Sequence, residues 1–153
     1  MRGQLRSVAV LLVSLLAVLC SGQETSSAPK VRPKRMEIPR YLPLAQQAGI
    51  SGDVTLRLTV DKAGKVVSVE IANTQPNGWG DGFAAMAIDA AKKSEFLCAS
   101  CSGDTFEYTV TYQFQVPPIP KDACTARPEL PASKVDSASH VTVRPRAWPC
   151  LYE

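Results

Sequence analysis

The chain has few of the groups that usually carry catalysis. Its 153 residues include one histidine, and aromatic residues make up 7% of the sequence. That histidine, His140, lies near Ser139 and Asp136 in a proline-punctuated stretch, whereas a catalytic triad brings together groups from across a fold. The sequence also lacks a glycine-rich phosphate loop and a paired-carboxylate motif. We therefore expect a protein that is not an enzyme and that has no catalytic residue, no metal site and no cofactor.

Long hydrophobic runs are also scarce, and the clearest one lies at the N-terminus. Val8–Leu19 follows Arg2 and Arg6 and precedes the small-residue sequence CSG, which is the pattern of a secretory signal. A membrane-spanning helix needs about 20 apolar residues, and this run is shorter. We expect residues 1–22 to be a signal peptide that directs export. An uncleaved membrane anchor and a lipoprotein modified at Cys20 are the alternatives.

Five cysteines are present, and removal of Cys20 with the signal leaves four. An even number in an exported chain suggests two disulfides, because thiols outside the cytoplasm tend to oxidise. The sequence does not choose among the possible pairings of Cys98, Cys101, Cys124 and Cys150. The alternatives are a structural zinc site formed by the four sulfurs and a redox-active pair, Cys98 and Cys101. A thioredoxin-type pair has its first thiol at a helix N-terminus, whereas this pair is expected to follow a helix.

One short segment contains a cluster of basic residues. The formal net charge is +3, and Lys30, Arg32, Lys34 and Arg35 interleave with valine and proline. Such a cluster could bind nucleic acid or an anionic membrane surface, but an exported protein seldom meets nucleic acid. Residues 23–40 have neither a strand period nor a helix period. We therefore expect a flexible linker, no nucleic-acid partner, and membrane contact only through the signal or an uncleaved anchor.

The most regular part of the sequence is a hairpin. Apolar and polar residues alternate over Val54–Val60, which is the pattern of a strand with one buried face. Asp61–Gly64 supplies the turn, since glycine can adopt the left-handed conformation that a short hairpin loop needs. The alternation resumes over Val67–Ile71. A short helix over residues 41–49 precedes the hairpin and is expected to end at its glycine.

Two further elements follow the hairpin. The alanine-rich stretch Phe83–Glu95 has no helix breaker, and its apolar residues lie on one face at helical spacing. Phe106–Val116 alternates aromatic or aliphatic side chains with polar ones and ends at a Pro-Pro pair, which predicts a long strand. Residues 117–153 then form a proline-rich tail that we expect to be tethered by disulfides, with one short strand at His140–Arg144.

The order of these elements limits the topology. A tight turn makes the first two strands antiparallel, and a strand-helix-strand connection makes the second and third strands parallel. Both conditions are met when the third strand lies beside the first. We therefore predict an α+β domain with a three-stranded antiparallel sheet in the order 2-1-3 and two helices on one face. The third strand then lies at an edge of the sheet.

An edge strand exposes unpaired backbone groups, which a protein either protects or uses. Phe106–Val116 has no proline and one charged residue, Glu107, so it can accept an extended peptide as an added strand. Alternatively, the tail strand His140–Arg144 covers this edge, and the domain is a closed structural module without a peptide partner. The residues expected to bind a partner are Phe106, Tyr108, Thr109, Val110, Thr111, Tyr112, Gln113, Phe114 and Gln115.

Several short sequences occur in a fixed order along residues 41–116. They are Tyr41 with Ala45 in the first helix, GDV at 52–54, VDKAGKV at 60–66, AIDAAKK at 87–93, and Phe96. In this order they resemble the C-terminal domain of TonB, the periplasmic energy transducer of Gram-negative bacteria. The resemblance implies a TonB C-terminal-like domain over residues 41–116. Ser94 stands where that family usually has tryptophan.

The resemblance implies a function and a location. Domains of this family bind a peptide segment of an outer-membrane receptor at the edge of their third strand, during TonB-dependent transmembrane transport. The implied protein is exported and periplasmic, or anchored in the inner membrane if residues 1–22 are retained, and its partner is a receptor or another periplasmic peptide segment. Residues 23–39 are too short to cross a periplasm at about 3.3 Å per residue, so we do not expect this chain alone to transduce force.

Two alternatives remain open. One is a homodimer through the same edge, and the other is a thiol-disulfide redox protein that uses Cys98 and Cys101.

Overall fold

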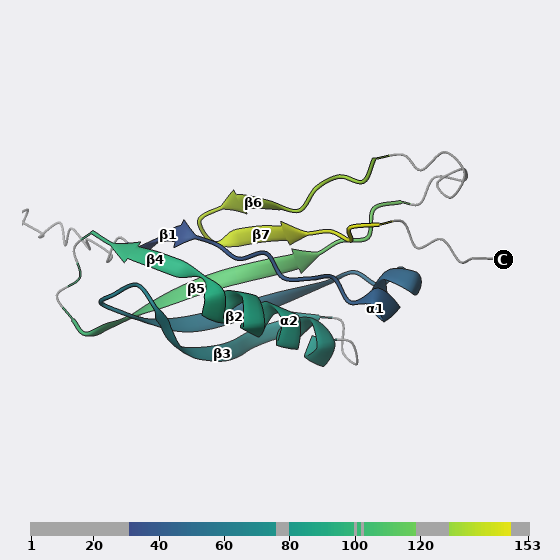
Figure 1. Cartoon of the computed structure of the whole chain (residues 1–153). Coiled ribbons are helices and arrows are strands. Elements are labelled where there is room, and N and C mark those ends of the chain that lie inside the picture. The colour runs from purple at the N-terminus through teal and green to yellow at the C-terminus, as the bar shows by residue number, and fades with distance from the viewer. Residues whose placement is uncertain (1–30, 76–79, 100, 102, 119–128, 148–153) are drawn as a thin grey trace, which may run out of the picture.

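The computed structural model describes residues 31–75, 80–99, 101, 103–118 and 129–147 (Figure 1). The elements in chain order are β1 Val31–Arg35, α1 Pro43–Gln47, β2 Gly52–Asp61, β3 Val66–Gln75, α2 Gly80–Lys93, β4 Glu95–Cys98, β5 Thr105–Phe114, β6 Lys134–Ser137 and β7 His140–Val143. Among the described helices, none is long and apolar enough to cross a membrane. The signal peptide predicted for residues 1–22 lies outside the described residues.

The hairpin of β2 and β3 forms, but only β2 follows the predicted alternation, because two bulges in β3 leave Val67 57% and Ile71 51% exposed. The inward-facing residues of β2 are buried: Val54, Leu56, Leu58 and Val60. The turn is closed by the Asp61 carboxylate, which accepts hydrogen bonds from the amides of Ala63 at 2.8 Å and Lys65 at 2.9 Å. Gly64 has a φ of 81°, in the left-handed region that glycine adopts without a steric penalty.

The larger sheet has five strands in the order β3-β2-β5-β7-β6. Its first three strands lie in the predicted order, and both of their pairings are antiparallel. The predicted three-stranded antiparallel sheet is wrong in extent, because two strands from the tail extend it. β7 pairs with β5 in parallel, and β6 pairs with β7 antiparallel. The sheet is therefore mixed, and the described part of the tail belongs to the fold.

Aromatic rings fill the core at the end of the domain near α1. Phe83 of α2 stacks on Phe114 of β5, with ring centroids 4.5 Å apart. Tyr41 meets both rings edge to face, with centroid distances of 5.7 Å to Phe83 and 5.8 Å to Phe114. Val141 and Val143 of β7 are fully buried in the same core. Burial of these valines makes the tail strand a part of the hydrophobic core.

α2 lies across β2 and β3 (Figure 1). Phe83, Ala87 and Ala90 on its apolar face are buried, as predicted. It extends over Gly80–Lys93, so it begins and ends earlier than the predicted helix. Ser94 follows it directly and is 1% exposed. The Ser94 hydroxyl donates to the Ala90 carbonyl oxygen at 3.0 Å and accepts from the Glu37 amide at 3.0 Å. This small side chain thus ties the segment before α1 to the end of α2.

A second, two-stranded sheet pairs β1 with β4 antiparallel. β1 lies inside the segment predicted to be a flexible linker, so that prediction is wrong for Val31–Arg35. The carboxylate of Glu95 in β4 lies 2.8 Å from the Lys65 ammonium and 3.5 Å from that of Lys34. Together these two cations hold the pKa of Glu95 below its ordinary value. Part of the basic cluster is therefore neutralised where β1 meets β4.

Candidate partner-binding edge

β5 has a strand partner along its whole length on one side and along only part of it on the other. All ten of its residues pair with β2 in an unbroken register. β7 pairs with Thr111–Phe114 alone. The Thr111 amide donates to the carbonyl oxygen of Ser139 at 2.8 Å. Of the two alternatives for Phe106–Val116, an open edge and one covered by His140–Arg144, the second therefore applies from Thr111 onward and the first before it.

The free part of this edge is Thr105–Val110. Backbone groups alternate in direction along a strand, and the Thr111 amide points at the tail. By the same alternation, Thr105, Glu107 and Thr109 direct their N–H and C=O groups away from β2. No strand in the described part of the chain pairs with these groups. A second strand could therefore be added here without removing any bond of the sheet.

The two outer rims of the sheet are protected in other ways. β3, on one rim, carries two bulges, since its register with β2 shifts twice. β6, on the other rim, has four residues, one register shift and a Lys134–Asp136 ion pair. Bulges, short strands and charges are common means by which natural sheets prevent further pairing. Thr105–Val110 has none of these features apart from the charge of Glu107.

Half-buried aromatic side chains border the free edge on the core side of the sheet. Tyr108 packs on Phe96 with ring centroids 4.8 Å apart, and Phe106 is half-buried beside it. The Tyr108 hydroxyl donates to the carbonyl oxygen of Ala138, which lies in the turn between β6 and β7. Burial raises the pKa of Tyr108. On the opposite face of the strand the exposed residues are Thr105, Glu107 and Thr109.

The residues predicted to bind a partner separate into three groups. Three have side chains that are 0% exposed and so belong to the core: Val110, Tyr112 and Phe114. Three direct backbone groups at β7: Thr111, Gln113 and Gln115. Three lie on the free part of the edge: Phe106, Tyr108 and Thr109. Thr105 and Glu107 also have outward backbone groups there, and the sequence prediction did not include them.

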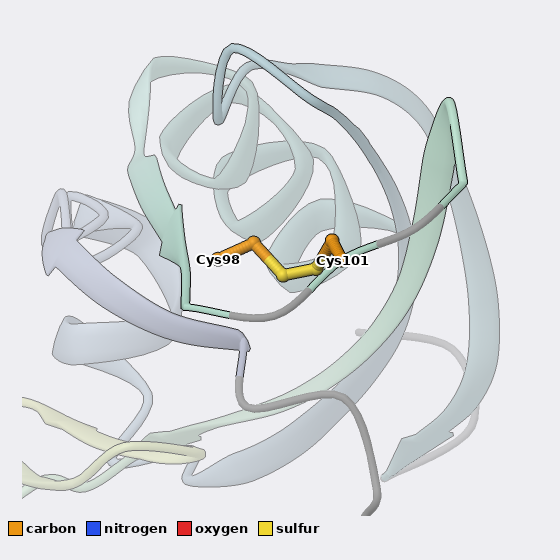
Figure 2. The surroundings of a disulfide bond; sticks show 2 residues. All are labelled: Cys98 and Cys101. Carbon is orange, nitrogen blue, oxygen red and sulfur yellow. A yellow bond between two sulfur atoms is a disulfide. The ribbon is translucent and has the colours of Figure 1, made fainter.

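The cysteine pair lies close to the start of this edge. Figure 2 shows the disulfide between Cys98, the last residue of β4, and Cys101, whose Cα atoms are 5.7 Å apart. Cys124 and Cys150 lie outside the described residues. Cys98 ends a strand rather than beginning a helix, so no helix dipole favours a thiolate there. The described ranges contain no group of three or more histidine, cysteine or acidic side chains that could hold a metal ion.

The fold and the edge together define a small α+β domain whose candidate site is the backbone of a strand. A family model described as the Gram-negative bacterial TonB protein C-terminal matches residues 37–116, which are more than half of the chain. The chain belongs to this TonB C-terminal family. The family expected from the sequence motifs is thereby confirmed.

Individual relatives show how far the likeness extends. Proteins named TonB from two strains of Xanthomonas campestris pv. campestris are each 36% identical to this chain over 70 residues, which are 46% of this chain and 30% of theirs. The chain therefore matches less than a third of the length of these relatives. A solution NMR structure of the Pseudomonas aeruginosa TonB C-terminal domain covers 56% of this chain and 83% of its own, with 25% identity and a TM-score of 0.41.

Proposed function

We propose that this domain binds an extended peptide segment of an outer-membrane transport protein by strand addition to Thr105–Val110 of β5. The role belongs to TonB-dependent transmembrane transport in the periplasm and involves no catalysis. One observation carries the proposal: β2 covers one side of β5 over its full length, and β7 covers the other side from Thr111 only. Thr105–Val110 therefore has one row of backbone N–H and C=O groups that can bind an added strand.

An added strand would be held mainly by main-chain hydrogen bonds. Thr105, Glu107 and Thr109 each offer an outward N–H and an outward C=O, and a typical hydrogen bond contributes about 0.5–1.5 kcal/mol net. In strand addition the main chain supplies affinity and alternate side chains supply selectivity. Side chains of the partner on the core side would pack against Phe106 and Tyr108. A site of this length favours weak and reversible binding.

β7 would limit the length of the added strand. Val141 and Val143 are 0% exposed, so displacement of β7 would return core surface to water at about 25 cal/mol per Å². The turn that precedes β7 is fixed to β5, because Ala138 accepts from Tyr108 and Ser139 accepts from Thr111. The partner is therefore expected to lie in line with β7 along the same side of β5 rather than to replace it.

The second candidate function is a closed structural module without a peptide partner. The pairing of β7 with Thr111–Phe114 favours it, since the tail occupies part of the predicted site.

A homodimer would use the same free edge with a second copy as the added strand. Sedimentation at several protein concentrations separates a dimer from a monomer that binds peptide.

Peptide titration of residues 23–153 tests the proposal, with periplasm-facing N-terminal peptides of outer-membrane receptors as ligands. Thr109→Pro removes an outward amide and leaves the ladder to β2 intact, since proline is tolerated where its nitrogen faces away from a neighbouring strand. Thr109→Ala keeps the amide and is the matched control. Strand addition predicts weaker binding for the proline variant alone, in protein that circular dichroism shows to be folded. If none of the peptides binds the unmodified chain, the closed module is the better account.

A further inference from the structure

A cavity of about 680 Å³ lies between the segment that leads into α1 and the chain that leaves β7. Cavities that bind ligands measure about 300–1,000 Å³. Three arginines line it: Arg40, Arg144 and Arg146. Among the described residues that line it there is no aspartate or glutamate. The cavity is therefore a concave site with charge of one sign.

Hydrogen bonds between distant parts of the sequence fix the walls of this cavity. The Ser133 hydroxyl accepts from the Arg144 amide at 2.7 Å and donates to the Arg144 carbonyl oxygen at 3.2 Å. The side-chain amide of Gln46 in α1 donates to the carbonyl oxygen of Ala147. Tyr41, which also lines the cavity, is 9% exposed and packs in the aromatic core. The cavity is thus built into the fold.

The three arginines have no acidic partner within the described ranges, where none of them takes part in an ion pair. Arg40 and Arg146 also line an adjoining cavity that contains Glu37 and Asp89. Those two carboxylates are already paired with other cations, Glu37 at 4.0 Å and Asp89 at 2.6 Å. Guanidinium groups that face one space repel one another, and an anionic ligand would remove that repulsion.

We propose that this cavity binds an acidic peptide segment, with Arg40, Arg144 and Arg146 holding its carboxylates. The planar guanidinium fork matches the two oxygens of a carboxylate. The arginines come from two segments on different walls, so carboxylates spaced along one chain can reach them together, whereas a compact anion would meet fewer of them. Pro131, which is exposed, and Leu130, which is half-buried, supply apolar surface for the rest of the peptide.

This site is separate from the free edge of β5. β7 runs parallel to β5, and its last residue pairs with Phe114. Arg144 follows directly, so the cavity lies near the end of β5 that is remote from Thr105. Figure 1 shows α1 and the exit of β7 at this same end of the domain. Binding of an acidic peptide in the cavity therefore does not depend on strand addition at Thr105–Val110.

Isothermal titration of the full exported chain with a hexaglutamate peptide tests the site, with inorganic phosphate as a separate arm. The double variant Arg40→Gln with Arg146→Gln removes two exposed cavity charges. The double variant Arg32→Gln with Arg57→Gln removes two exposed charges elsewhere and matches its net charge. The dissociation constant for hexaglutamate should rise about fivefold in the cavity variant, the central value for the loss of two exposed ion pairs, and less than twofold in the control.

Three outcomes would overturn the proposal. The first is a difference of less than twofold between the two double variants, which would mean that only net charge matters. The second is the absence of hexaglutamate binding at millimolar concentration. The third is phosphate binding as tight as that of the peptide, which would make the cavity a site for compact anions.

Discussion

Gly64 in the hairpin turn and Phe96 in β4 lie backbone against backbone. The Phe96 amide donates to the Gly64 carbonyl oxygen at 2.9 Å. A Cβ atom on Gly64 would lie 2.9 Å from the Phe96 carbonyl carbon and closer still to its oxygen. Phe96 in turn packs on Tyr108 beside the free part of β5. Glycine at this position therefore lets β4 dock on the hairpin and support the candidate site.

Gly64→Ala should destabilise the domain strongly. The substitution forces an L-residue into the left-handed region, which costs about 1–2 kcal/mol, and it adds a clash with the Phe96 backbone. We expect a total loss of about 2–4 kcal/mol in the free energy of unfolding, measured by urea denaturation. Gly49→Ala is the matched control, because Gly49 also has a positive φ, 66°, but no other group would lie within 4 Å of a Cβ atom there. Equal losses for the two variants would contradict the docking contact.

Val143→Ala tests whether the tail strand is part of the core. Removal of two buried methyl groups leaves a cavity, and we expect a loss of about 1–3 kcal/mol in the free energy of unfolding. Val135→Ala on β6, where the side chain is 44% exposed, should change it by less than about 0.5 kcal/mol. A tail that only rests on the surface would give similarly small changes for both variants.

Tyr112 makes the stability of the domain sensitive to high pH. Burial raises the pKa of Tyr112 to about 12, with the nearby Ser94 hydroxyl acting in the opposite direction. Its ordinary pKa is 10.0, so the unfolded chain ionises first, and stability falls as the pH rises from about 10 to about 12. The full effect is about 3 kcal/mol at 1.36 kcal/mol per pKa unit. Urea denaturation from pH 8 to pH 11 should show a shallower decline for Tyr112→Phe.

The same variant has a second expected result at neutral pH. The Tyr112 hydroxyl is buried and makes no hydrogen bond of normal geometry with the described residues, since the nearby Ser94 hydroxyl donates to Ala90 and accepts from Glu37. Removal of an unpaired buried polar group is neutral or stabilising, because its desolvation is no longer unfavourable to folding. We expect Tyr112→Phe to unfold at the same urea concentration as the unmodified protein, or at a higher one. A loss above about 1 kcal/mol would indicate that the hydroxyl has a partner.

The disulfide between Cys98 and Cys101 is expected to be structural. Replacement of both residues with serine should lower the free energy of unfolding by about 2 kcal/mol, the chain-entropy value for so short a loop. Peptide affinity should not change, since neither sulfur lies on the free edge. A thiol count on the folded protein provides the control. If the reduced protein instead reduced a model disulfide catalytically, the redox alternative would gain direct support.

Local patterns explain which parts of the fold could be predicted from the sequence. β2, α2 and β5 each have a clear period of 2 or 3.6, and their buried residues follow those periods. In β3 the bulges break the period, so Val67 and Ile71 are exposed. β1 was not predicted, because its sequence VRPKR contains proline and three charged residues instead of alternating apolar and polar residues. β4 was not predicted, because its four residues begin just after Ser94 and continue the breaker-free sequence of α2.

The candidate site could be predicted only in part, because its limit is set by a contact between distant segments. The sequence indicates both that β5 could be an edge and that His140–Arg144 could cover it. The residue of β5 at which pairing with the tail begins depends on two contacts. Val141 and Val143 are buried in the core, and the Ser139 carbonyl oxygen accepts from the Thr111 amide. No local period encodes that register, so Thr105–Val110 could not be separated from the covered residues in advance.

Amide hydrogen exchange with and without a receptor peptide is the most direct test of strand addition. The amides of Glu107 and Thr109 point away from β2, so they should exchange quickly in the free protein. Tyr108 and Val110 already donate towards β2 and serve as internal controls. Bound peptide should slow exchange at Glu107 and Thr109 and leave exchange at the two controls nearly unchanged. Peptide binding with unchanged exchange at Glu107 and Thr109 would contradict it.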